Sequence, residues 1–193
     1  MSKKFKRGFL KADGGSAAIE AVFIIPFMYI LYVGTMDVTS FISFNKKLTD
    51  IATVTSDAVA QFPNTLTRAN ITDIENTINL IMPSGAANVQ VDVYDYYMNG
   101  GTITKRWSTK SPNATNCPAP STTNLSTLMG AGNDVIVATS CMKYTPWVVT
   151  YGAQSLMGAA SFNITQTFAA VPYGSTTLKC VTISGGSTLC NEI

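Results

Sequence analysis

The sequence contains no histidine, and only 12% of its 193 residues are charged. Without histidine, neither a Ser-His nor a Cys-His catalytic pair can form, and acid-base chemistry would fall to Asp, Glu, Lys or Tyr. The best candidates for a pair of carboxylates are Asp92 and Asp95. They have opposite parity on a predicted strand and therefore face opposite sides of it. We interpret them as sheet-edge and surface acids, and we predict no enzymatic activity and no catalytic residue.

Other absences bear on ligands. The chain has four cysteines but no C-x-x-C motif, which together with the lack of histidine argues against a zinc site. No glycine-rich loop follows a predicted strand and opens a helix, so nucleotide binding has no support. No long basic face marks a nucleic-acid interface. We therefore expect no metal, no cofactor and no nucleic-acid partner.

The N-terminal tail is basic and precedes a long apolar run. Five bases oppose the single acid Asp13, which gives 5 − 1 = +4; the bases are Lys3, Lys4, Lys6, Arg7 and Lys11. No residue from Ala21 to Met36 is charged. A membrane helix needs about 20 residues, and the span reaches that length when it is extended back to Ser16. By the positive-inside rule, the basic tail stays in the cytoplasm.

This extension brings Glu20 into the cytoplasmic half of the bilayer. A carboxylate costs about 2.5 kcal/mol or more in the hydrocarbon core, so it needs a partner. A cut between Gly15 and Ser16 would create an α-ammonium one helical turn from Glu20, on the same chain or on a neighbouring subunit. Such a cut precedes the apolar segment, whereas a secretory signal peptide is cut after it.

This arrangement resembles the class III signal of type IV pilin-like proteins. The basic leader followed by Gly15, Ser16, Glu20 and Pro26 is similar to the TadE/TadF-like pseudopilins of the tight adherence (Tad/Flp) type IV pilus, and the specific resemblance covers about residues 1–45. Ala21 stands where major pilins of this system usually have tyrosine. About 130 residues follow the predicted long helix, whereas major subunits are little more than that helix. The resemblance therefore implies a minor pilin or pseudopilin.

The resemblance also implies a function, partners and a location. A prepilin peptidase would process the precursor, which would then be required for pilus assembly, as an initiating or tip component, in surface adhesion. The implied partners are the inner-membrane assembly platform, the major pilin and a second TadE/TadF-like pseudopilin that forms a heterodimer. The protein would cross the bacterial inner membrane once, with a periplasmic C-terminal domain. Two alternatives remain open: an uncleaved signal anchor, and a membrane-anchored extracytoplasmic binding module or adhesin outside any filament.

The predicted fold class is α+β. We expect a leader over residues 1–15, a long helix over 16–62 and an extracytoplasmic globular domain over 63–193. The helix would have a membrane part, 16–36, kinked at Pro26, where proline removes a backbone hydrogen bond. In its extracytoplasmic part, 37–62, apolar residues recur every three or four positions; they are Val38, Phe41, Ile42, Leu48, Ile51, Ala52, Val59 and Phe62.

The globular domain should pack an antiparallel sheet on the long helix. A capping box of Thr72 and Glu75 predicts a short second helix from about Asp73 to Ile81. Alternation and turn signals predict four strands; these are 89–96, 103–107, 135–144 and 162–171, with a hairpin turn at 99–101. Two segments stay open: a polar loop over 110–133, functional or disordered, and the apolar stretch 146–160, which would rest on the membrane, on a partner or on the core.

The four cysteines all follow the apolar span, on the oxidising side of the membrane, where disulfides form. Cys117, Cys141, Cys180 and Cys190 allow three pairings. We favour Cys117 with Cys141, and Cys180 with Cys190. The second bridge would close a C-terminal hairpin whose three-residue loop, 184–186, sets residues 180 and 190 opposite each other.

Overall fold

The computed structural model describes residues 14–62, 65–66, 68–82, 88–111, 117–129, 134–147, 161–173 and 179–180, some of them only by their backbone. These residues form two compact units, which are described separately. The first contains the α1 helix up to Ser40, with Pro146 and Trp147. The second contains the other described residues, from Phe41 onward. The predicted leader, residues 1–15, lies outside the described residues except for its last two, which begin α1.

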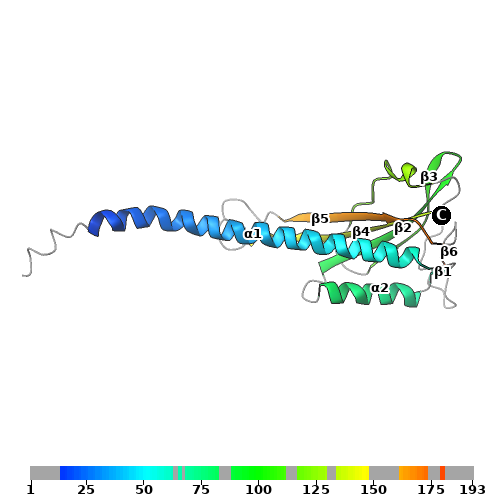
Figure 1. Ribbon diagram of the computed structural model, residues 1–193, viewed down its shortest axis with the longest axis horizontal. Helices are drawn as coiled ribbons and strands as arrows, with labels where there is room; N and C mark the ends of the chain where they lie inside the picture. Colours follow the sequence, from blue (N-terminus) through cyan, green and yellow to red (C-terminus); the bar gives the residue numbers. More distant parts are fainter. Residues whose placement is uncertain are drawn as a thin grey trace, which may run out of the picture. The chain divides into compact units, whose positions relative to one another are not determined.

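The described elements give an α+β fold, as predicted (Figure 1). In chain order they are α1 (Gly14–Ala60), β1 (Thr65–Leu66), α2 (Arg68–Ile81), β2 (Val89–Asn99), β3 (Thr102–Lys110), the short 3-10 helix η3 (Leu125–Thr127), β4 (Val135–Tyr144), β5 (Phe162–Ala170) and β6 (Lys179–Cys180). The main sheet has the order β3-β2-β4-β5, and all its neighbouring strands are antiparallel.

The C-terminal half of α1, from Phe41 to Ala60, packs on one face of this sheet. Leu48 and Ile51 are fully buried, and the Ser140 hydroxyl of β4 donates a hydrogen bond of 2.7 Å to the Leu48 carbonyl. The core on this face also includes Val59 of α1, Ile78 of α2 and side chains of all four strands; the strand residues include Val89, Val91, Val93, Trp107, Ile136 and Ile164. The predicted apolar stripe of α1 is therefore a core face from Phe41 onward, while Val38 and Ile42 are exposed.

The opposite face of the sheet is covered by the loop that follows β3. Leu125 and Met129 are buried there against side chains of β2 and β4; these are Tyr94, Tyr96, Val135 and Val137. A disulfide between Cys117 and Cys141 ties this loop to β4, which confirms the first predicted bridge. The part of the loop from 117 to 129 therefore packs on the sheet, and the two central strands, β2 and β4, are buried on both faces along most of their length.

The β2–β3 hairpin confirms its predicted turn. Gly100 and Gly101 both have positive φ, 57° and 84°, as a two-residue type I′ turn requires. The observed β3 continues past the predicted end at Trp107 to Lys110, because Asp92, Val93 and Tyr94 of β2 pair with these extra residues. Strand β4 begins and ends at the predicted residues, and β5 ends one residue before its predicted end.

The α2 helix corrects one prediction. It begins at Arg68, five residues before the predicted start at Asp73. Thr72 and Glu75 therefore lie inside the helix and do not form its N-terminal cap. Arginine and alanine, the first two residues of α2, have high helix propensity, so the helix extends through the capping motif.

The C-terminal hairpin is described only in part. Lys179 and Cys180 form β6, which pairs in parallel with Thr65 and Leu66 of β1, a contact that the sequence did not predict. Residues 181–193, with Cys190 and the predicted second bridge, lie outside the described residues. The apolar stretch 146–160 is described only at Pro146 and Trp147; in that unit the Trp147 amide donates a hydrogen bond of 2.6 Å to the Asp37 carboxylate.

Candidate functional site

The N-terminal apolar part of α1 exposes its side chains on all sides. Its most apolar 18-residue window has a mean hydropathy of 1.8, and none of that window is buried. Eleven consecutive residues, from Val22 to Tyr32, are exposed. A soluble helix would bury one face, whereas a helix that is apolar all round suits lipid or other apolar helices. Among the described residues, α1 is the one helix long and apolar enough to cross a membrane.

Glu20 lies at the start of this exposed apolar segment. The α1 helix is continuous from Gly14, so Ser16 and Glu20 are four residues apart on one helical face. The side chain of Glu20 is exposed. The backbone at the predicted cut, Gly15 and Ser16, is helical, and nothing more of these two residues is described. This geometry allows an ammonium at residue 16 to reach the carboxylate at residue 20.

Pro26 lies inside α1 and does not end it. Further along α1, the hydroxyls of Thr35 and Thr39 are hydrogen-bonded within the helix. Each donates to the backbone carbonyl four residues earlier, at 2.7 and 2.8 Å. Threonine therefore adds no unpaired donor at the outer end of the apolar segment. The kink at Pro26 stays a prediction.

No family model, curated protein or solved structure matches the chain.

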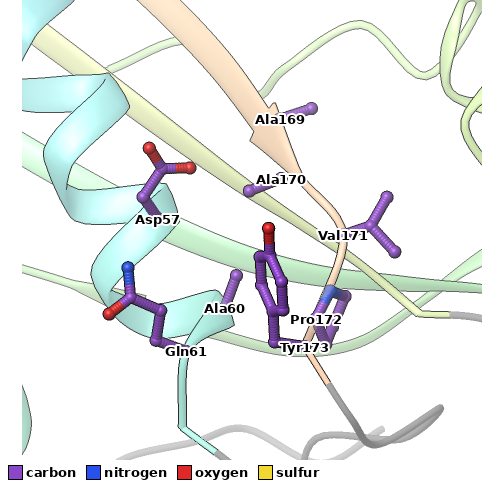
Figure 2. Close-up of a pocket in the computed structure, with 8 residues that line it drawn as sticks. All are labelled: Asp57, Ala60, Gln61, Ala169, Ala170, Val171, Pro172 and Tyr173. Atoms are coloured by element: carbon purple, nitrogen blue, oxygen red, sulfur yellow. The ribbon is translucent and has the colours of Figure 1, made fainter.

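A cavity of about 590 Å³ lies in the second unit, where α1 and β5 end (Figure 2). Asp57, Ala60 and Gln61 line it from α1, and residues 169–173 line it from β5 and the turn after it. The Tyr173 amide donates a hydrogen bond of 2.8 Å to the Ala60 carbonyl and so joins the two walls. No local pattern in the sequence predicts this site, because its two walls, residues 57–61 and 169–173, are far apart in the chain.

Asp92 and Asp95 correct another prediction, because both are fully buried in β2 and neither is a surface acid. Their opposite parity is as expected. Asp92 accepts hydrogen bonds from the Gln90 amide at 2.7 Å and from the Tyr94 hydroxyl at 3.2 Å. Burial raises the pKa of Asp92, and burial beside Asp92 also raises the pKa of Tyr94. The sequence reading failed because it treated β2 as an edge, whereas it is a central strand.

Asp95 lies near a second buried acid, Asp134, and both contact Arg106 of β3. The Arg106 guanidinium is 2.9 Å from Asp134 but 3.7 Å from Asp95, and it also stacks on the Tyr97 ring at 4.6 Å. Burial, with the charge of Asp134, raises the pKa of Asp95 to about 8, although Arg106 opposes the shift. No group of three or more side chains that could hold a metal ion occurs among the described residues.

Asp95 should make the stability of the second unit depend on pH. Its usual pKa is 3.8 and its folded pKa about 8, so between these values the folded state holds a proton that the unfolded state lacks. This contribution is complete below pH 4 and is lost as the pH rises through 8. Asp95→Asn mimics the protonated acid, so at pH 8.5 it should raise the free energy of unfolding by roughly 1–3 kcal/mol. Urea unfolding at pH 5 and pH 8.5 measures the difference.

The exposed acid Asp73 of α2 provides the control. Asp73→Asn should differ from the wild type by less than about 0.5 kcal/mol at either pH, as surface substitutions usually do. An Asp95→Asn variant that is equally destabilised at pH 5 and pH 8.5 would contradict the prediction.

Proposed function

We propose that the protein is a minor pilin or pseudopilin of a Tad/Flp-type pilus. Its precursor is inserted in the bacterial inner membrane, cut after Gly15 by a prepilin peptidase and drawn into the pilus as an assembly-initiating or tip component. Its mechanism is the packing of helices, not catalysis. The partners are the peptidase, the assembly platform, the major pilin and a second TadE/TadF-like pseudopilin.

The observation that carries this proposal is the unequal burial of one continuous helix. From Phe41 outward, α1 contributes buried side chains to the core of a globular unit. From Val22 to Tyr32 every side chain is exposed and apolar or proline. Exposed apolar surface of this length needs lipid, sister helices or both. A pilus subunit uses the two in succession, lipid before assembly and sister helices after it.

A second observation supports a role for Glu20. The basic tail precedes the helix, and Glu20, the only charged residue from Gly14 to Met36, lies where the apolar segment begins. A new ammonium at Ser16 would compensate that acid within one helical turn. Cleavage would remove residues 1–15 and their charge of 5 − 1 = +4, so the net charge would change from +2 to −2. Cleavage would thus remove the positive charge that holds this end of the chain at the cytoplasmic surface.

The mature chain should begin at Ser16, which N-terminal sequencing of the protein from membranes and sheared pili can test. Its mass should be lower than that of the full chain by the mass of residues 1–15. Gly15→Leu should block the cut, because the peptidase would no longer find glycine before the scissile bond. Gly14→Leu, a change of the adjacent glycine, is the matched control and should still be cut.

An intact chain beginning at Met1 in fully piliated cells would contradict the proposal. That result would favour the membrane-anchored binding module, in which α1 is a permanent anchor and no cut is needed.

A further inference from the structure

The two edges of the main sheet differ in charge. β3 forms one edge and carries Lys105, Arg106 and Lys110. β5 forms the other edge, and no residue from Ser161 to Tyr173 is charged. Charged side chains, lysine above all, keep edge strands from pairing with other chains. Among the described residues, β4 is the only strand neighbour of β5, so the outer side of β5 lacks this protection.

This uncharged edge is also long and partly apolar. β5 has 9 residues, more than the usual five or six. Phe162 and Phe168 are 45% and 38% exposed, and Val171 and Tyr173 just beyond the strand are 40% and 77% exposed. Strands with exposed aromatic and β-branched residues gain from cross-strand contacts with a new neighbour. The edge therefore offers both backbone groups and side-chain area to an added strand.

The cavity of Figure 2 lies at the C-terminal end of this same edge. Its α1 wall ends the helix, where the last carbonyls carry partial negative charge. The last turn of α1 contains the exposed acid Asp57 and no base. Tyr173 supplies an aromatic ring on the β5 wall, and the remaining wall residues include Ala60, Ala169 and Ala170. A carboxylate, a helix C-terminus and an aromatic ring together suit a lysine or arginine side chain.

We propose that the outer edge of β5 and this cavity bind an extended segment of another protein chain, which adds an antiparallel strand and places a lysine or arginine beside Asp57. Backbone hydrogen bonds would supply affinity, and the cavity would select the basic side chain. The identity of that chain as another pilus subunit rests on the proposed function. The surface thus gives this protein a second assembly contact, separate from the apolar part of α1.

A second copy of this chain fits the site poorly. If β5 paired with β5 of a copy, the copy would bring no cation, because residues 161–173 are uncharged. If β5 paired with β3 of a copy, it would meet Lys105, Arg106 and Lys110, and charged side chains along an edge strand oppose such pairing. Of the bases there, Arg106 is already held by Asp134 and stacked on Tyr97. The charge pattern therefore favours a different chain.

Site-specific photo-cross-linking tests this inference in cells that produce the full chain and its partners. The probe is p-benzoylphenylalanine in place of Phe168, an exposed aromatic residue of β5; the control puts it in place of Thr102, which is exposed on β3. The Phe168 probe should form an adduct with another pilus protein, and mass spectrometry should map it to an extended segment that contains lysine or arginine. Thr102 should give none.

Substitutions of Asp57 test whether binding depends on its negative charge. Asp57→Asn should lower the yield of the Phe168 adduct roughly tenfold, the effect of about 1.4 kcal/mol, whereas Asp57→Glu should retain most of it. Formation of the Cys117–Cys141 bridge, measured by mass without reduction, verifies that each variant folds.

Three outcomes would overturn the inference: no adduct at Phe168, an adduct with a second copy of this chain, or an adduct that Asp57→Asn leaves unchanged. Failure here is distinguishable from failure of the proposed function. A chain cut before Ser16 that gives no adduct refutes only the strand-addition site. An uncut chain that gives a charge-dependent adduct refutes only the pilus role.

Discussion

Glu20→Ala should strongly reduce pilus assembly while cleavage after Gly15 continues. Under the proposed function, the peptidase acts at residues 15 and 16, and the role of Glu20 begins when the new ammonium at Ser16 needs a counter-charge in lipid. Without the carboxylate, each docking step would leave an ammonium without its partner in the bilayer, where a charge costs about 2.5 kcal/mol or more. Since 1.4 kcal/mol changes an equilibrium tenfold, piliated cells should decrease by roughly tenfold or more.

The measurement pairs two readouts in one strain. Electron microscopy or shearing counts the pili, and immunoblotting separates the precursor from the mature chain. The matched control is Asp50→Ala, which removes an exposed acid from the same helix beyond the membrane segment and should leave both readouts unchanged. Glu20→Asp tests how far the carboxylate must extend toward the ammonium. The aspartate side chain is one methylene shorter, so this variant should restore assembly in part.

Normal piliation in Glu20→Ala cells would remove this residue from the assembly mechanism. Loss of cleavage together with loss of pili would also contradict the prediction, because it would place Glu20 in recognition by the peptidase. Only the combination of a mature chain and a strong loss of pili agrees with a carboxylate that acts after the cut.

Local patterns in the sequence were enough to predict most elements of the fold. The stripe of apolar residues predicted a helix ending near residue 62, and α1 ends at Ala60, because Pro63 and the residues beside it interrupt the pattern. The β2–β3 turn followed from two adjacent glycines, which alone adopt positive φ at little cost. Exposure of the apolar segment of α1 also followed from the sequence, since no polar face exists from Ala21 to Met36.

Contacts between residues that are far apart in the chain could not be predicted in the same way. Alternation assigned Asp92 and Asp95 to opposite faces of β2, but it could not show that β2 is central or that the loop carrying Leu125 covers the second face. The pairing of β1 with β6 involves two residues on each strand, too few for a periodic signal. The cavity next to Asp57 depends on where β5 ends, which is a property of the assembled sheet.

Trp107→Ala should destabilise the globular unit by about 3–5 kcal/mol, the usual cost of removing a large buried aromatic side chain. Among the described residues, Trp107 is the largest of the fully buried side chains and is 1% exposed. It lies on the sheet face that α1 covers, in one cluster with Leu48 and Ile51, and its backbone is opposite Asp95 in the β2–β3 register. Its loss would leave a cavity beneath the helix that close-packed neighbours fill only in part.

The chain supplies its own control, because its second tryptophan, Trp147, is 59% exposed. Trp147→Ala should change the free energy of unfolding by less than about 0.5 kcal/mol, as expected at an exposed site. Urea unfolding of the full chain in detergent, followed by circular dichroism of the sheet, compares the two variants. Equal stability of Trp107→Ala and Trp147→Ala would contradict a core built around Trp107. A large loss for Trp107→Ala alone would locate the principal stabilisation where α1 meets the sheet, so the same helix would both anchor the fold and present the apolar segment for assembly.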